Sequence, residues 1–303
     1  MNKIVIIGCG NVGMSYAYAL LNQRTKVEEL VLIDINKEKI VGEAMDLNHC
    51  LAFAPSKIKI KAGDYSDCND ATIICIAAGK NQDVGETRLD LINKNYEVFK
   101  SIITEINKTN FNGIYLIATN PVDIMTYITK EISGFPSNRV IGSGTMLDTA
   151  RLRYLVGEEL NVNPKNVHAY VIGEHGDSEF VAWDSAIVGL KPVKEYVEKN
   201  ILENIALSVK NSAYEIIEKK GATYYGIGMC LVRITNAILD NDNSILSLSV
   251  YNEEKDLYYG LPAILNKQGV KKIIEIDLSS KENEKLNETI NIINEYKNKL
   301  RRN

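Results

Sequence analysis

The feature that most constrains the fold is a glycine-rich turn between an apolar strand and a helix, at the start of the chain. Lys3–Ile7 is a run of branched residues that predicts a strand, and GCGNVG follows it directly with Gly8, Gly10 and Gly13. ELVLID then predicts a second strand, which ends at Asp34 about 20 residues after the turn. Together these elements form a specific dinucleotide-binding fingerprint, whereas a lone glycine motif would be weak.

Each residue type in this fingerprint has a physical reason. Gly8 permits the tight turn, Gly10 lets the backbone approach a pyrophosphate, and Gly13 lets the helix pack on the sheet. The phosphates would lie at the positive helix N-terminus. Asp34 can accept hydrogen bonds from a ribose 2′-hydroxyl and would repel a 2′-phosphate, so we predict NAD as the cofactor. Val12, in the same turn, belongs to the predicted binding set; a structural turn with a chance aspartate is the alternative.

Strands and helices continue to alternate through the first half of the chain. Three further runs predict strands, at residues 57–63, 72–79 and 113–120, and Leu89–Asn107 predicts the clearest helix between them. The last two strand runs are almost continuously apolar, as in a sheet covered on both faces. The pattern predicts an α/β fold with a doubly wound parallel (Rossmann) sheet, whose ligands bind at the carboxyl ends of the strands. Gly79 and Asn120 stand at two such ends, so we expect both to contact the cofactor, and Asn120 also the substrate.

A polar loop, KNQDVGETR, joins the strand ending at Gly79 to the helix starting near Leu89. It carries Gln82 and, at its far end, Arg88. An exposed connector is the simplest interpretation. The functional alternative is a lid that closes over the cofactor, a common role for such loops.

The stretch from Leu147 to Asp177 collects three chemically complementary side chains. Asp148 and Arg151 are three residues apart in a helical pattern and so share a face. An extended run then places His175 in a glycine-flanked turn. Such a pair is often only a surface ion pair, and a single histidine is often structural. In one pocket, however, the three could hold a carboxylic acid and move a proton beside it.

Composition excludes several other classes of function. The formal net charge of −4 argues against a nucleic-acid partner, for which a basic face is expected. No apolar run approaches the length of a membrane span, and the N-terminus is not that of a signal peptide. Five cysteines, an odd number without a CxxC pair, fit a reduced, cytoplasmic compartment. The three scattered histidines make a metal site an unattractive hypothesis, so no metal is predicted.

Five motifs, in this order and spacing, resemble those of the L-lactate/malate dehydrogenase family: GCGNVG, GKNQDVGETR, ATNPVDI, GSGTMLDTAR and GEHGDS. The resemblance covers essentially the whole chain and is closest to the bacterial L-lactate dehydrogenases. It implies an NAD-dependent enzyme that interconverts pyruvate and L-lactate. A dinucleotide-sensing module without enzyme activity is the alternative of another class, and it would not need the charged set as well as the glycine turn.

The resemblance implies a role for each member of that set. His175 would be the proton donor and acceptor, Asp148 its partner, and Arg151 the group that holds the substrate carboxylate. Arg88 would polarise the substrate carbonyl, and Asn120 matches the family's active-site asparagine. These residue types suit the chemistry, because a protonated imidazole can donate to the developing oxyanion and an arginine fork suits a carboxylate.

Gln82 distinguishes the possible substrates. The resemblance implies glutamine here in lactate dehydrogenases and arginine in malate dehydrogenases. Charge counting agrees, since a further arginine would be an unpaired charge unless the substrate brought a second carboxylate. We therefore expect pyruvate; larger 2-keto acids remain an alternative, and oxaloacetate a weaker one.

Two basic residues in the same region predict a second site. Arg153 lies about 200° around the helix from Arg151, so it cannot serve the same pocket. His168 stands at the other end of the extended run from His175. The resemblance implies that Arg153 and His168 bind fructose 1,6-bisphosphate across a subunit interface and favour a homotetramer. Two ordinary surface residues are the alternative.

The C-terminal half predicts an α+β substrate domain of residues 144–303, after a dinucleotide-binding domain of residues 1–143. We expect a long helix over Val193–Lys220, a second helix, three strands and a last helix opened by a Ser279–Glu282 capping box. The resemblance places Thr223 in the substrate pocket. Ile227 is expected either against the nicotinamide or in the core.

Overall fold

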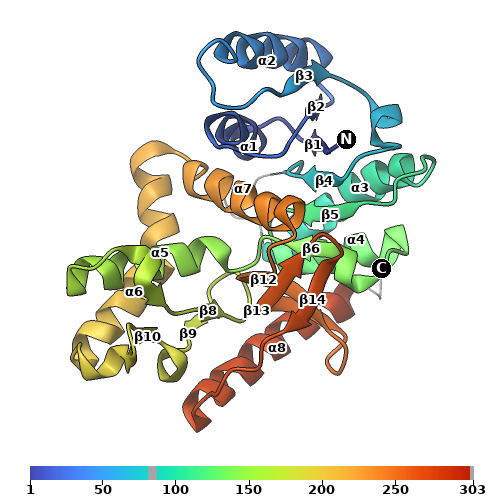
Figure 1. The fold of residues 1–303 in the computed structure, drawn as a ribbon. Helices are drawn as coiled ribbons and strands as arrows, with labels where there is room; N and C mark the ends of the chain where they lie inside the picture. Colours follow the sequence, from blue (N-terminus) through green and yellow to red (C-terminus); the bar gives the residue numbers. More distant parts are fainter. Residues whose placement is uncertain (81–86, 301–303) are drawn as a thin grey trace.

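One large twisted sheet occupies the centre of the computed structural model, which describes residues 1–80 and 87–300 (Figure 1). Its nine described strands are, in spatial order, β14 (Gly269–Ile273), β13 (Leu257–Asn266), β12 (Ser244–Asn252), β6 (Val140–Gly142), β5 (Ile114–Ile117), β4 (Ile73–Ile76), β1 (Lys3–Ile7), β2 (Glu29–Ile33) and β3 (Lys59–Ala62). The strands from β3 to β6 are parallel, in the order 3-2-1-4-5-6 of doubly wound dinucleotide-binding folds. The predicted fold class is confirmed.

Helices pack around this sheet and extend beyond it. They are α1 (Asn11–Asn22), α2 (Lys37–Cys50), α3 (Arg88–Ile106), α4 (Val122–Ser133), α5 (Met146–Leu160), α6 (Lys199–Lys220), α7 (Tyr225–Asp240) and α8 (Ser280–Leu300). Every residue of β1, β4 and β5 is buried, which explains why these strands are almost continuously apolar. None of the helices within residues 1–80 and 87–300 is long and apolar enough to cross a membrane.

The long helix predicted from Val193 begins later than expected. Val193–Glu195 forms a 3₁₀ turn, and α6 starts only at Lys199. The N–H of Val193 donates to the carbonyl oxygen of Ala186 over 2.9 Å, and the side chains of Val193 and Val197 are buried. These tertiary contacts hold the first residues in a separate turn and outweigh their helical spacing.

The second half of the chain continues the same sheet. The antiparallel strands β12, β13 and β14 join it through β12, where Ser249 pairs with Gly142 of β6. Five short strands form two small sheets beside it: β7 (Val167–His168), β10 (Ile187–Val188) and β11 (Lys191–Pro192) in one, and β8 (Val171–Ile172) and β9 (Phe180–Val181) in the other. The sheet thus runs across the predicted boundary at residue 143, and the division into two domains stays a prediction.

The turn that contains His175 is anchored from both sides. Gly173 exchanges two backbone hydrogen bonds with Gly260 of β13, of 3.0 and 2.7 Å. On the other side, the N–H of Glu174 donates to the hydroxyl of Thr289 in α8 over 2.9 Å. The large sheet and the last helix therefore fix the backbone on which the predicted catalytic histidine stands.

Candidate active site

Five of the predicted site residues line one cavity of about 260 Å³, although they come from distant parts of the sequence: Arg88, Asn120, Asp148, Arg151 and His175. The α5 helix contributes the acid and one arginine, the loop after β5 contributes the asparagine, and α3 begins with the other arginine. A face of α6 closes the cavity with Lys210, Tyr214 and Ile217. The site therefore combines the carboxyl ends of parallel strands with groups from the second half of the chain.

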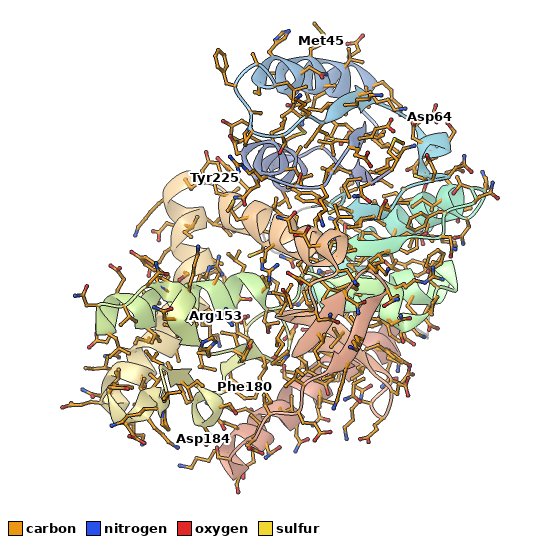
Figure 2. The ribbon with its side chains drawn as sticks, viewed as in Figure 1. Met45, Asp64, Arg153, Phe180, Asp184 and Tyr225 are labelled. Atoms are coloured by element: carbon orange, nitrogen blue, oxygen red, sulfur yellow. The ribbon has the colours of Figure 1, made fainter. Side chains whose placement is uncertain are left out.

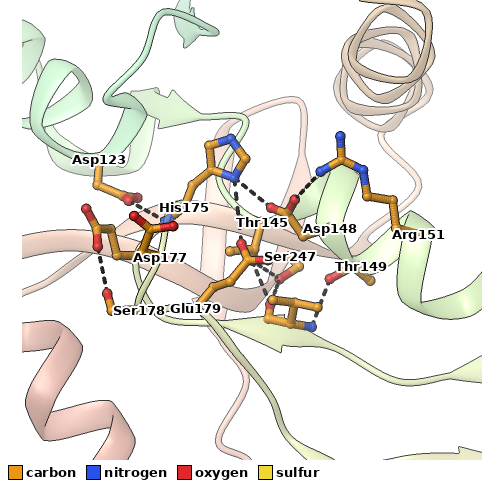
Figure 3. A network of polar contacts seen from close by, with 12 residues as sticks. Asp123, Thr145, Asp148, Thr149, Arg151, His175, Asp177, Ser178, Glu179 and Ser247 are labelled. Atoms are coloured by element: carbon orange, nitrogen blue, oxygen red, sulfur yellow. Dashed lines mark hydrogen bonds and ion pairs between the residues drawn. The ribbon is translucent and has the colours of Figure 1, made fainter. Parts of the chain in front are cut away.

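His175, Asp148 and Arg151 form a continuous chain of polar contacts (Figure 3). Nδ1 of His175 lies 2.6 Å from Oδ2 of Asp148, and Nη1 of Arg151 donates to Oδ1 of the same carboxylate over 2.9 Å. The carboxylate is almost completely buried, whereas the histidine side chain is 23% exposed. Asp148 therefore fixes the ring orientation and leaves Nε2 as the nitrogen that can exchange a proton with a substrate.

The acid environment changes the proton affinity of the ring. Burial alone would lower the pKa of His175, but the charge of Asp148 and its hydrogen bond, with help from Glu179 and Asp123, raise that pKa to about 9. The pKa of Asp148 is lowered, because His175 and Arg151 outweigh the effect of its burial. The pair is thus an imidazolium beside a carboxylate at neutral pH.

Asp123 holds the backbone of the catalytic turn. Its Oδ2 accepts the N–H of His175 over 2.8 Å, and its Oδ1 accepts the hydroxyl of Ser249 over 2.5 Å. Burial raises the pKa of Asp123 to about 6, while these two hydrogen bonds act in the opposite direction. Asp123 lies in the first turn of α4. Its hydrogen bond to the N–H of His175 therefore joins the start of α4 to the turn that contains the histidine.

Arg88 reaches the same turn from the first position of α3. A capping box between Thr87 and Asp90 fixes where that helix begins. Nη2 of Arg88 lies 2.8 Å from Oε1 of Glu174 and donates to the carbonyl oxygen of His175 over 3.3 Å. Its Nε is buried and has no hydrogen-bond partner among the described residues. The guanidinium is therefore beside the histidine but is not fully paired.

The predicted cofactor end of the sheet has the geometry that a pyrophosphate needs. Gly8 has φ +96°, and a Cβ on Gly13 would lie 2.1 Å from the carbonyl oxygen of Gly8, so neither position tolerates a side chain. The space around Gly10 is open, and no side chain caps the N-terminus of α1. Asp34 accepts the N–H of Cys9 over 2.8 Å at the end of β2. This turn, helix end and acid fit a dinucleotide.

Other predicted residues are placed outside the cavity or beyond the described chain. Gln82, on which the substrate prediction depends, lies outside the described residues, as does most of the predicted lid. Thr223 is in the loop between α6 and α7 and does not line the cavity within the described part of the chain. Val12 and Ile227 are partly buried against the core. Gly79 packs tightly, because a Cβ there would lie 2.5 Å from Thr119.

Several contacts of the site were not predicted from the sequence. Asn95 of α3 donates to the carbonyl oxygen of Asn120 over 2.9 Å, and thereby fixes the elbow that carries the predicted asparagine. Asp123 and Glu179 are buried acids near the histidine. Glu179 follows His175 by four residues, and the apolar Phe180 and Val181 after it were the one signal that this segment turns inward.

Asp148, His175 and Glu179 form a group with metal-ligand chemistry in the described chain, with ligand atoms within 4.8 Å of one another. Nδ1 of the ring is already bonded to Asp148, however. A histidine placed so that it could exchange a proton, two arginines that could bind an anion and a dinucleotide turn on one sheet are the features of a nicotinamide-dependent dehydrogenase of anionic substrates.

Comparisons with known proteins specify the class. Residues 2–142 match the family model of the lactate/malate dehydrogenase NAD-binding domain, and residues 145–302 match that of its alpha/beta C-terminal domain. The chain is 50% identical to L-lactate dehydrogenase 1 of Peribacillus psychrosaccharolyticus, covering 97% of this chain and 96% of the relative. It is also 50% identical to an L-lactate dehydrogenase of a Geobacillus species, with 97% and 95% covered.

Solved structures give the same result. A lactate dehydrogenase from a Medee basin deep-sea metagenome library superposes with a TM-score of 0.95 at 53% identity, covering 97% of both chains. The minor L-lactate dehydrogenase of Enterococcus mundtii, in its ligands-bound form, superposes with a TM-score of 0.94 at 44% identity, again over 97% of both chains. The chain belongs to the lactate/malate dehydrogenase family and is an NAD-dependent oxidoreductase.

Proposed function

We propose that the protein is an L-lactate dehydrogenase, which reduces pyruvate to L-lactate with NADH and catalyses the reverse reaction. The observation that carries this proposal is the pairing of His175 with Asp148 beside Arg151 and Arg88 in one cavity. The names of the similar proteins, all lactate dehydrogenases, support it. NADH, when bound, supplies the hydride.

The side chains divide the remaining work. Arg151 offers a planar guanidinium to the carboxylate of the keto acid. His175, which is protonated at neutral pH, donates its Nε2 proton to the keto oxygen as negative charge develops there. Asp148 holds the ring by Nδ1 and stabilises its charged form. In lactate oxidation the neutral ring accepts the proton instead.

Arg88 and Asn120 act on the carbonyl side of the substrate. Arg88 adds positive charge next to the developing oxyanion, where a site without water makes that charge most effective. Asn120 lines the same cavity, and its backbone is held by Asn95. We assign Thr223 to the substrate pocket from the family resemblance alone.

Substrate choice is assigned to Gln82 by charge. With Asp148 and His175 balancing each other, Arg151 matches the single carboxylate of pyruvate. A glutamine-to-arginine change, Gln82→Arg, would leave an unmatched cation unless the substrate were a dicarboxylate. We expect the ratio of kcat/KM for oxaloacetate to that for pyruvate to rise by orders of magnitude in this variant. An unchanged ratio would contradict the assignment.

A panel of 2-keto acids tests the proposed function directly. NADH oxidation is followed with pyruvate, oxaloacetate and larger 2-keto acids, each with and without fructose 1,6-bisphosphate. We expect pyruvate to give the highest kcat/KM. Preference for a branched keto acid or for oxaloacetate would assign the alternative substrates, and NADH binding without oxidation under every condition would favour a sensor.

We also propose that fructose 1,6-bisphosphate activates the enzyme through Arg153 and His168. Arg153 lies on α5, away from the cavity, with its Nε bonded to the carbonyl oxygen of Ala169 over 3.2 Å and its guanidinium over the ring of Tyr170 (Figure 2). His168 is exposed on β7, next to Ala169 in the chain. Both side chains are basic, and basic side chains suit the phosphates of the effector.

The double variant Arg153→Ala/His168→Ala tests this site. Its activity with saturating pyruvate is measured against effector concentration, beside the mass of the assembly in solution. We expect activation and effector-dependent homotetramer formation to be lost together. Undiminished activation would exclude these two residues.

Assembly, location and domain roles complete the proposal. We propose a homotetramer, with residues 1–143 binding NAD and residues 144–303 supplying most substrate contacts. A cytoplasmic location is supported by the five cysteines, all of which are free thiols. Size-exclusion chromatography with light scattering, with and without effector, tests the assembly.

A further inference from the structure

Glu179 is a buried acid beside the proton-transfer pair that the proposed mechanism does not use. Its side chain is 7% exposed, and its Oε2 lies 4.0 Å from Nδ1 of His175. One of its carboxyl oxygens also lies within 4.8 Å of a carboxyl oxygen of Asp148. Figure 3 shows it approaching the ring from the turn before β9, on the other side from Arg151. Two acids and one imidazole thus form a single cluster.

Two buried carboxyl groups this close repel each other when both are ionised, so the site favours a proton on one of them. Asp148 is the member that stays ionised, since Arg151 and His175 both contact it. Glu179 has no such cation: within the described chain its one ion pair is the 4.0 Å contact with His175. The contact geometry therefore places this proton on Glu179.

The other charged groups around Glu179 do not change this assignment. On its own turn, Glu174 pairs with Arg88 and Asp177 accepts the hydroxyl of Tyr214. The remaining titratable groups near the cluster of Glu179, Asp148 and His175 are Asp123 from α4, Arg151 from α5, Lys210 from α6, Cys230 from α7 and Lys285 from α8. Lys285 lines a pocket with Glu179, but the described residues show no ion pair of 4.0 Å or less between them. Lys210 lines the cavity with Glu179, but no ion pair of 4.0 Å or less joins them among the described residues.

Charge counting shows what this proton does for substrate binding. With neutral Glu179, the groups Asp148, His175 and Arg151 sum to one positive charge, which the single carboxylate of a keto acid neutralises. Ionising Glu179 lowers the local charge by one, so that a bound keto acid would place its carboxylate beside an additional buried negative charge. Such a charge is costly, so anion binding and ionisation of Glu179 exclude each other.

We propose that Glu179 is a positioning residue that must carry a proton for the keto acid to bind, and that it donates this proton in a hydrogen bond to Asp148. This inference rests on the proposed function, since it concerns the same substrate. Burial, followed by the charge of Asp148, raises the pKa of Glu179 to about 9, which is close to that of His175. Wild-type enzyme therefore loses two required protons over the same alkaline range.

The test compares wild type with Glu179→Gln from pH 7 to 10.5. Glutamine keeps the shape and an N–H donor toward Asp148 but cannot ionise. For wild type we expect kcat/KM for pyruvate to fall about a hundredfold per pH unit at the alkaline limit, and for the variant about tenfold, since one proton remains. Each profile is normalised to its own value at pH 7. Glu158→Gln, an exposed glutamate on the same helix as Asp148, is the matched control and should follow wild type.

Two further measurements do not depend on turnover. The affinity of the enzyme–NADH complex for oxamate, measured by NADH fluorescence, should fall with rising pH about a hundredfold per unit in wild type and about tenfold per unit in Glu179→Gln at the alkaline limit. The infrared difference spectrum of wild type minus Glu179→Gln at pH 7.5 should contain the carbonyl band of a protonated carboxylic acid.

Three results would overturn the inference. They are a fall in kcat/KM of only about tenfold per pH unit at the alkaline limit in wild type, a fall of about a hundredfold per unit in Glu179→Gln, and the absence of the infrared band of the protonated acid. A wild type that reduces no pyruvate would instead overturn the proposed function, and the infrared band would still report the proton of Glu179. A one-proton limb with normal turnover would remove the role of Glu179 alone.

Discussion

Replacing Asp148 by asparagine isolates the effect of its charge on His175. Asparagine has the same shape, and its side-chain oxygen can still accept from Nη1 of Arg151, which is 2.9 Å from Oδ1 in the wild type. The change therefore removes the negative charge beside Nδ1 with little change in packing. We expect it to alter the pH range of activity more than the structure.

The size of the effect follows from the pKa of the ring. Asp148 is the largest influence that raises the pKa of His175 to about 9, and burial alone would lower that pKa below 6.5. A rise in the pKa of His175 from 6.5 to about 9 corresponds to about 3 kcal/mol of stabilisation of the protonated ring, at 1.36 kcal/mol per pKa unit. At pH 8.5 roughly three-quarters of wild-type rings are protonated. The fraction in the variant would be about 1% if the pKa returned to 6.5, and Glu179 and Asp123 keep it above the value that burial alone would give. At pH 5.5 the two proteins differ little.

The assay is kcat/KM for pyruvate reduction from pH 5.5 to 9.5, which reports the protonation of the free enzyme. We expect the loss caused by Asp148→Asn to grow from a small factor at pH 5.5 to at most about a hundredfold at pH 8.5, because Glu179 and Asp123 still raise the pKa of the ring. NADH affinity, followed by fluorescence, should not change. Asp277→Asn, at an exposed aspartate in the loop before α8, is the matched control.

A deficit of constant size across the pH range would refute this reasoning. It would mean that Asp148 only orients the ring and contributes nothing to its proton affinity. The same conclusion would follow if kcat/KM of the variant still declined only near pH 9, as in wild type.

Three further predictions concern single features. Arg151→Lys should raise the KM for pyruvate by about 10- to 100-fold with a smaller change in kcat, because a single point charge replaces a bidentate contact. Steady-state kinetics measure this, and an unchanged KM would exclude Arg151 as the ligand of the substrate carboxylate. Asp34→Ser should weaken NADH binding about tenfold and strengthen NADPH binding, as fluorescence titration measures; equal losses for both would contradict 2′-hydroxyl recognition. The free energy of unfolding should fall as pH rises from about 4.5 through 9. The folded pKa values of Glu179 and His175 are both raised to about 9, from ordinary values of 4.5 and 6.5, so the stability that each confers is lost between its ordinary and its folded pKa. Thermal melts of wild type and of Glu179→Gln, in which the loss should be smaller and begin nearer pH 6.5, check this.

The fold was largely predictable because its signals are local. The glycine turn and the apolar runs of β1, β4 and β5 specify buried parallel strands directly. The predicted start of α6 was wrong by several residues, since the hydrogen bond of Val193 to Ala186 and the burial of Val193 decide it. That β12 continues the sheet beyond β6 could not be predicted, because a single residue pair, Ser249 with Gly142, makes the junction.

The candidate site was predictable where one residue type is required by the chemistry. A histidine, its acid and a carboxylate-binding arginine occur in recognisable motifs, and the structure brings His175, Asp148 and Arg151 into contact. Residues that support them were given no role by the sequence, even where they stand inside one of the motifs, as Asp123 does in ATNPVDI. Asp123, in the first turn of α4, resembles an ordinary partner of the helix dipole in the sequence, and only the fold shows that it accepts the N–H of His175.

Protonation is the property that the sequence hides most completely, because it depends on burial and on neighbours from several elements. Asp148 and Glu179 are both acids next to one imidazole, yet the pKa of the first is lowered and that of the second is raised. The difference arises because Arg151 donates to Asp148, whereas Glu179 is buried beside the charge of Asp148 and forms no ion pair with an arginine or lysine among the described residues. If Arg151 contacted Glu179 instead of Asp148, Glu179 would be the ionised acid and Asp148 the protonated one. The position of this arginine, rather than a property of either acid, therefore decides which carboxylate carries the charge opposite the imidazolium of His175.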